Sequence, residues 1–122
     1  MKKIVVQKYG GSSLSTIGKV KKVAKKIVTR FKEGNQIVVV VSAMGNETDR
    51  LLKLAYRISS APDKRELDML VSTGEQVSIA LLAMAIHALG NKAISFTARH
   101  AGILTDGAVS YTHLTLPTIL LV

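Results

Sequence analysis

Two β-branched runs on either side of an amphipathic segment constrain the fold of this chain most strongly. Residues 3–8 and 36–42 are rich in Ile and Val, which favours β-strands. Between them, apolar residues recur at spacings of three and four, as in a helix with one buried face: Ile17, Val20, Ala24, Ile27 and Phe31. Strand, helix and strand within about 40 residues form a βαβ unit, so we expect parallel strands joined by a right-handed crossover. The second strand is apolar on both faces, which predicts a sheet covered on both sides.

The rest of the chain continues the alternation of helices and strands. A second helix is predicted over about residues 47–59, and a third helix follows the break at Ala61-Pro62-Asp63. We expect Ser72-Thr73-Gly74 to interrupt the third helix before the nearly all-apolar segment 77–89. Residues 93–97 are predicted to form a third strand. With 122 residues, the sequence is one α/β domain or a piece of one.

The basic residues are concentrated near the N-terminus. The chain has 17 Lys and Arg against 8 Asp and Glu, a formal net charge of +9. Residues 1–32 contain ten of the bases and no acid, whereas residues 33–122 contain seven bases and eight acids. Such an excess is typical either of a nucleic-acid or membrane patch or of a solvated helix face, and we favour the solvated face. Aromatic residues are only 4% of the chain, so few side chains are available to stack on nucleic-acid bases.

Composition and short motifs exclude several other classes of protein. Because Cys is absent, disulfide scaffolds, cysteine zinc sites and thiol catalysis are excluded. Histidines at positions 87, 100 and 113 lack metal-ligand spacing, so we predict no metal site. The run Ile79–Ile86 is too short to span a membrane, and the N-terminus has no signal-peptide core. The chain is therefore expected to be cytoplasmic, without a membrane partner.

Small and polar residues follow the first two predicted strands. Lys8-Tyr9-Gly10-Gly11-Ser12-Ser13 precedes a helix, and its glycines would let backbone N–H groups approach an anion beside the Lys8 ammonium. This pattern is neither a P-loop nor a dinucleotide fingerprint, and a simple tight turn is the alternative. Ser42–Asp49 follows the second strand, where ordinary helix capping by Asn46 or Thr48 is the better local interpretation.

Glu75, in the polar segment Ser72–Gln76, is the acidic residue of most interest. A carboxylate beside a long apolar stretch is costly to bury unless it is paired or faces a ligand. Glu75 could therefore bind a ligand ammonium group, or it could complement a helix dipole in a first turn. The local pattern leaves both interpretations open.

Four segments of this chain, taken in order and spacing, resemble the start of aspartate kinase: Lys8–Ser13, Val39–Asp49, Arg65–Leu70 and Ser72–Gln76. The resemblance covers about residues 2–107 and is closest to the bacterial lysine-pathway enzymes. It implies the amino-acid kinase fold, a three-layer α/β/α sandwich with a mostly parallel sheet, here truncated. Residues 1–108 would form the N-terminal part of that domain.

The resemblance also implies an activity and a set of site residues. Aspartate kinases transfer the γ-phosphoryl group of Mg-ATP to L-aspartate, giving 4-phospho-L-aspartate on the route to lysine, threonine and methionine. Lys8 would be catalytic, neutralising the phosphoryl group in transfer. The residues implied in ATP binding are Lys8, Tyr9, Gly10, Gly11 and Ser12. Those implied in aspartate binding are Ser42, Thr48 and Glu75. The whole enzyme would be a homo-oligomer. Its nucleotide substrate would be the complex of ATP with Mg²⁺.

Some features depart from the family pattern. Residues 98–102 read Ala-Arg-His-Ala-Gly instead of Gly-x-Gln-Ala-Gly, so we assign no role to His100. Nothing matches the family's later Gly-Gly-Ser-Asp segment, and we therefore expect this chain alone to be inactive. Two alternatives are a superfamily kinase acting on glutamate, N-acetylglutamate, carbamate or UMP, and a basic nucleic-acid-binding module. The segments Arg65–Asp68 and Ser72–Gln76 favour aspartate.

The C-terminal segment differs in character from the rest of the chain. Residues 109–122 end on an apolar run and resemble one reading frame of a sequencing adapter. We interpret them as a non-native tail produced by read-through, to be left out of fold reasoning. Coding DNA that continues differently after Gly107 would support this interpretation, and DNA without the adapter would refute it.

Overall fold

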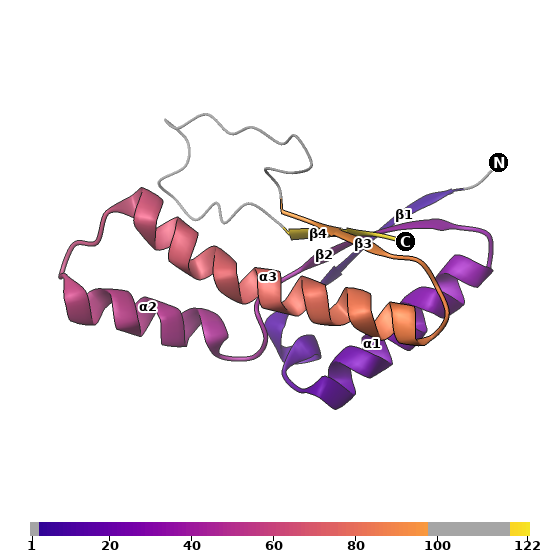
Figure 1. Cartoon of the computed structure of the whole chain (residues 1–122), viewed down its shortest axis with the longest axis horizontal. Coiled ribbons are helices and arrows are strands. Elements are labelled where there is room, and N and C mark those ends of the chain that lie inside the picture. The colour runs from indigo at the N-terminus through magenta and orange to yellow at the C-terminus, as the bar shows by residue number, and fades with distance from the viewer. Residues whose placement is uncertain (1–2, 98–117) are drawn as a thin grey trace.

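The computed structural model describes residues 3–97 and 118–122, which form one sheet and a set of helices (Figure 1). The elements follow the predicted order closely. They are β1 (Ile4–Tyr9), the 3-10 turn η1 (Gly11–Leu14), α1 (Ile17–Lys32), β2 (Gln36–Val41), α2 (Glu47–Ile58), α3 (Lys64–Ala88), β3 (Ile94–Phe96) and β4 (Thr118–Leu121).

The described strands form a mixed sheet in the order β1-β2-β4-β3. β1 and β2 are parallel, with Ile4 opposite Gln36 and Tyr9 opposite Val41, which confirms the predicted βαβ unit. β4 is antiparallel to both β2 and β3. Consequently β1, β2 and β3 point the same way, but two of the three described strand pairings are antiparallel, so the described sheet is mixed rather than mostly parallel.

One face of the sheet carries the core. Ile37, Val39 and Val41 alternate along β2 and are at most 3% exposed, because α1 and α3 lie across this face (Figure 1). On the opposite face of β1, Ile4 and Val6 are 67% and 65% exposed. The expectation of a sheet covered on both sides is therefore met on one side only within the described residues. These residues supply two layers of the expected three.

Side-chain caps mark the starts of α1 and α3. The Thr16 hydroxyl accepts a hydrogen bond from the Lys19 N–H (3.2 Å) and caps α1, which ends before Gly34 at φ 95°. Asp63 caps α3 in the same way, accepting from the Glu66 N–H at 3.1 Å. These local signals place the bounds of both helices.

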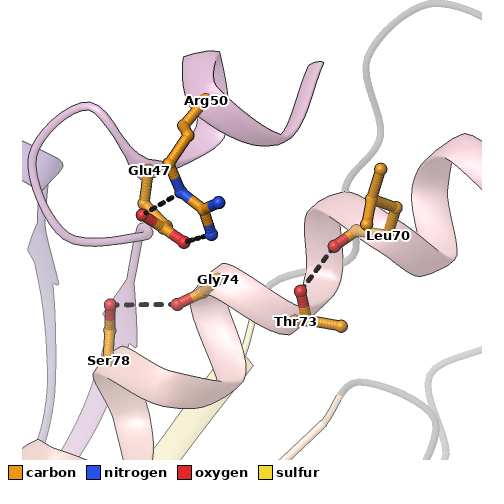
Figure 2. Close-up of polar contacts among 6 residues, drawn as sticks. All are labelled: Glu47, Arg50, Leu70, Thr73, Gly74 and Ser78. Carbon is orange, nitrogen blue, oxygen red and sulfur yellow. Dashed lines mark hydrogen bonds and ion pairs between the residues drawn. The ribbon is translucent and has the colours of Figure 1, made fainter. Parts of the chain in front are cut away.

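The predicted interruption at Ser72-Thr73-Gly74 is wrong, since α3 runs through it without a break. The Ser72 hydroxyl donates to the Met69 carbonyl at 2.8 Å, and the Thr73 hydroxyl donates to the Leu70 carbonyl at 2.6 Å (Figure 2). These polar side chains therefore find partners in the preceding turn of the helix itself.

α3 is long and apolar enough to cross a membrane by length and composition. It packs against α1 and α2, and its Leu82 and Ile86 are fully buried. A buried core helix meets the same criteria of length and hydropathy. Its contacts thus agree with the prediction that the apolar run 79–86 belongs to a buried helix.

The predicted boundary between residues 1–108 and the tail 109–122 lies outside the described residues. Within the described part of that tail, β4 lies between β2 and β3. Its Leu120 pairs with Val39 and Ser95 and is fully buried. The non-native origin of the tail remains a proposal.

Candidate functional site

The loops that follow β1 and β2 are hydrogen-bonded to each other at the carboxyl ends of these strands. The Ser42 N–H donates to the Tyr9 carbonyl at 3.1 Å, and the Gly45 N–H donates to the Gly11 carbonyl at 2.9 Å. The carboxyl edge of a parallel sheet is where ligands of α/β proteins usually bind. The structure thus brings together two of the segments that the sequence singled out.

The two glycines after β1 have different surroundings. A Cβ atom on Gly11 would lie 2.8 Å from the Ala43 carbonyl oxygen and 3.1 Å from that of Gly45, so the loops could not approach as closely. Gly10 has an extended backbone (φ −83°, ψ 174°) and no atom within 4 Å of such a Cβ. Gly11 therefore serves the contact between the loops, whereas Gly10 borders open space.

Lys8 and Tyr9 lie on opposite faces of the sheet because side chains alternate along β1. Lys8 is exposed on the face of the sheet that none of the described helices covers. Tyr9 is half-buried against the core, and its hydroxyl donates to the Gln7 side-chain carbonyl at 3.0 Å. Burial raises the pKa of the Tyr9 phenol. The predicted ATP residues are thus divided between two sides of the sheet edge.

Ser12 lies in η1 and is exposed, and its carbonyl accepts a hydrogen bond from Lys19 Nζ at 3.2 Å. This contact was not predicted, because the lysines of residues 17–32 look like a solvated helix face in the sequence. Ser12 and Lys19 are seven residues apart, on a turn and on a helix, and no sequence pattern predicts a hydrogen bond at that spacing. Lys19 ties the first turn of α1 to the loop after β1.

Gly74 allows α3 to pack closely against α2 and the loop after β2. A Cβ atom at this position would lie 3.0 Å from Ala43 Cβ and 3.3 Å from Glu47 Cγ. Figure 2 shows Gly74 on α3 facing the start of α2. An isolated glycine within an apolar helical pattern often has such a packing reason, and this signal was available in the sequence.

Glu75 follows Gly74 and is only 8% exposed, in the part of α3 that packs on this loop. Thr48 is half-buried in the first turn of α2, and Ser42 is half-buried directly after β2. The three predicted aspartate-binding residues therefore come from adjoining elements. Their binding roles remain a prediction.

Glu47 and Arg50 form an ion pair on α2 beside Gly74 (Figure 2). Arg50 donates from both Nε and Nη2 to the two carboxylate oxygens of Glu47. These hydrogen bonds lower the pKa of Glu47 and raise that of Arg50. Because the pair is well exposed, solvent screens it strongly, and we assign it a role in positioning the start of α2 rather than a large effect on stability.

Among residues 3–97 and 118–122, no three His, Cys, Asp or Glu side chains gather in a way that could hold a metal ion. His87 is hydrogen-bonded through Nε2 to the Ala93 carbonyl at 2.8 Å. His100, with the altered segment 98–102, lies outside the described residues.

Known proteins similar to this chain are kinases. Aspartokinase of Geobacillus stearothermophilus is 55% identical over 103 residues, which cover 84% of this chain and 25% of the relative. Aspartokinase of Corynebacterium glutamicum is 54% identical over 102 residues, covering 84% and 24%. The crystal structure of aspartate kinase from Synechocystis matches with a TM-score of 0.73 and 52% identity, over 75% of this chain and 16% of that one.

The chain spans about a quarter of the length of these curated relatives. The model of the amino acid kinase family matches residues 3–119, which include the elements that carry the candidate site. The two-layer arrangement described above is the corresponding part of that fold. From the family model and the structural match together, we conclude that the chain belongs to the amino acid kinase family.

Proposed function

We propose that this chain is part of an enzyme that transfers the γ-phosphoryl group of Mg-ATP to the side-chain carboxylate of L-aspartate. The observation that carries the proposal is the joined pair of loops after β1 and β2, with the buried Glu75 in the helix packed against them. Aspartokinase relatives at 55% identity support the same substrate. The product would be 4-phospho-L-aspartate, which supplies lysine, threonine and methionine synthesis.

The chemistry of phosphoryl transfer suits this arrangement. The reaction depends on positioning and on neutralising charge more than on covalent catalysis. Lys8 would neutralise charge on the transferring group, while the backbone at Gly10 and Gly11 would donate to ATP phosphates. Glu75 would hold the aspartate ammonium, with Ser42 and Thr48 completing the substrate contacts. An analogue without the amine would lose the contact with the Glu75 carboxylate, which gives selectivity for the amino acid.

The direct test measures acyl phosphate formation by the enzyme encoded by the complete reading frame, trapped with hydroxylamine in the presence of ATP and aspartate. Activity with aspartate, and little with glutamate, N-acetylglutamate, carbamate or UMP, would support the proposal. A preference for one of those acceptors would assign another kinase of the family. The 122-residue chain alone is expected to be inactive, since it spans about a quarter of its relatives.

The role of Glu75 is tested by Glu75→Gln in the complete enzyme. Removing one charge of a buried pair costs about 2–5 kcal/mol, so we expect kcat/KM for aspartate to fall by about 30-fold or more, mainly through KM. Glu33→Gln is the matched control, because Glu33 is an exposed carboxylate at the far end of α1. Equal effects of the two variants would refute the assignment of Glu75.

Lys8→Gln provides the corresponding test of the phosphate side. If Lys8 neutralises charge that develops during transfer, kcat should fall with little change in KM for aspartate. An unchanged kcat would refute its catalytic role.

The proposal also includes a cytoplasmic, homo-oligomeric whole enzyme that acts without a nucleic-acid or membrane partner.

A further inference from the structure

A groove of about 420 Å³ lies between the end of β1, η1 and one flank of α1. Its volume is within the range of small-molecule sites, which is about 300–1,000 Å³. Three elements contribute to its walls: Tyr9 from β1, Ser12 and Ser13 from η1, and Lys19, Lys22, Val23 and Lys26 from α1. The lysines recur at spacings of three and four, so they form one stripe along the helix.

The groove is strongly cationic, and nothing nearby in the sequence balances its charge. Residues 1–32 contain no acidic residue. The salt bridges found among the described residues join arginines to glutamates, and none involves Lys19, Lys22 or Lys26. Three lysines of α1 and two serines of η1 therefore line the same groove. Such a surface attracts an anion that can contact several of these groups at once.

The groove adjoins the proposed nucleotide loop without coinciding with it. Lys8 points to the other face of the sheet, and neither Lys8, Gly10 nor Gly11 lines the groove. Tyr9 and Ser12 do line it, although the family resemblance groups them with the ATP residues. Lys19 connects the two places, because it lines the groove and its Nζ donates to the Ser12 carbonyl.

We propose that this groove is a second anion site, which binds a small multivalent anion with phosphate or carboxylate groups. Lys22 and Lys26 supply the fixed charge, and the hydroxyls of Ser12 and Ser13 supply neutral donors. When Lys19 contacts the anion, its hydrogen bond to the Ser12 carbonyl weakens. Anion binding therefore changes the contacts of the loop after β1. The site shares Tyr9 and Ser12 with the residues implied in ATP binding, but it does not include Lys8, the residue proposed to act on the transferring phosphoryl group.

Titration calorimetry of the 122-residue chain with inorganic tripolyphosphate at physiological salt tests this site, and citrate is the second probe. We expect one anion per chain. Lys22→Gln/Lys26→Gln should weaken binding about tenfold or more, because both ammonium groups line the groove. Lys21→Gln/Lys25→Gln is the matched control, since it removes the same charge from the same helix outside the groove. It should change the affinity less than twofold.

Each outcome decides the proposal. Binding of tripolyphosphate alone assigns a phosphate ligand, and binding of both probes assigns multivalent anions in general. Equal weakening by the two double variants would overturn the proposal, because it would show diffuse attraction to a basic helix. Loss of binding in Lys8→Gln with full binding in Lys22→Gln/Lys26→Gln would place the anion at the nucleotide loop and would also overturn it. Absence of binding, or binding of long oligonucleotides only, would overturn it as well.

Discussion

Substituting Gly11 by alanine tests whether the contact between the two loops holds the candidate site together. The new Cβ would lie 2.8 Å from the Ala43 carbonyl oxygen, which belongs to the backbone and cannot rotate away as a flexible side chain could. Forcing an extra methyl group into such a contact costs about 1–3 kcal/mol. The shift also breaks the 2.9 Å bond from the Gly45 N–H to the Gly11 carbonyl, worth about 1 kcal/mol. Gly11→Ala should therefore destabilise the chain by about 2–4 kcal/mol.

Gly10→Ala is the matched control one residue away. Its Cβ would meet no atom within 4 Å, and its φ of −83° suits any residue. Alanine at such a position stabilises by about 0.4–1 kcal/mol, because it restricts the unfolded chain. Urea unfolding of both variants should thus differ by about 2.5–5 kcal/mol, with unchanged m-values. Hydrogen exchange at the Gly45 amide should quicken in Gly11→Ala alone.

A difference below about 1 kcal/mol between the two variants would refute this reasoning. It would mean that the loop after β2 moves freely and that its bond to Gly11 contributes little. Full protection of the Gly45 amide in Gly11→Ala would contradict the argument independently of total stability. In either case the close approach at Gly11 would not organise the site.

Three further perturbations test local features. Burial raises the pKa of Tyr9 above 10.0, so the contribution of the neutral phenol to stability is complete below that pH and is lost as the pH rises through the folded pKa. Phenolate absorbance should follow the titration, and the free energy of unfolding should fall over the same pH range. The Arg50 hydrogen bonds lower the pKa of Glu47 below 4.5, so that contribution is present above pH 4.5 and lost as the pH falls through the folded pKa. NMR titration should find the Glu47 pKa restored in Arg50→Gln. Asp63→Ala removes the cap of α3 and should cost about 1 kcal/mol in urea unfolding.

Local sequence signals predicted the elements well because each depends on a few neighbouring residues. The three- and four-residue spacing from Ile17 to Phe31 requires only one buried face, and α1 forms over that stretch. Thr16 and Gly34 end the helix through their own backbone and side-chain chemistry. Parallel pairing of β1 with β2 follows from the crossover between them.

Features that depend on tertiary contacts were not predictable in the same way. Ser72, Thr73 and Gly74 form a polar triplet, which by composition resembles a helix break. The hydroxyls bond instead within α3, and Gly74 admits the start of α2, so the triplet is a packing site. The deeper burial of one face of β2 likewise depends on which segments of the chain lie over the sheet, and its run of consecutive valines looks identical in either case.

The block Lys8–Ser13 shows most clearly what a motif cannot convey. A strand has a side-chain period of two, so the side chains of Lys8 and Tyr9 leave opposite faces of β1. Gly11 is needed by the neighbouring loop, and the Ser12 carbonyl is held by Lys19. Six consecutive residues that look like one phosphate-binding unit thus carry separate tasks on two sides of the sheet edge. Charge on the Lys8 side and charge in the α1 groove can therefore be changed separately, and this separability makes the proposed nucleotide loop and the proposed second anion site distinguishable by experiment.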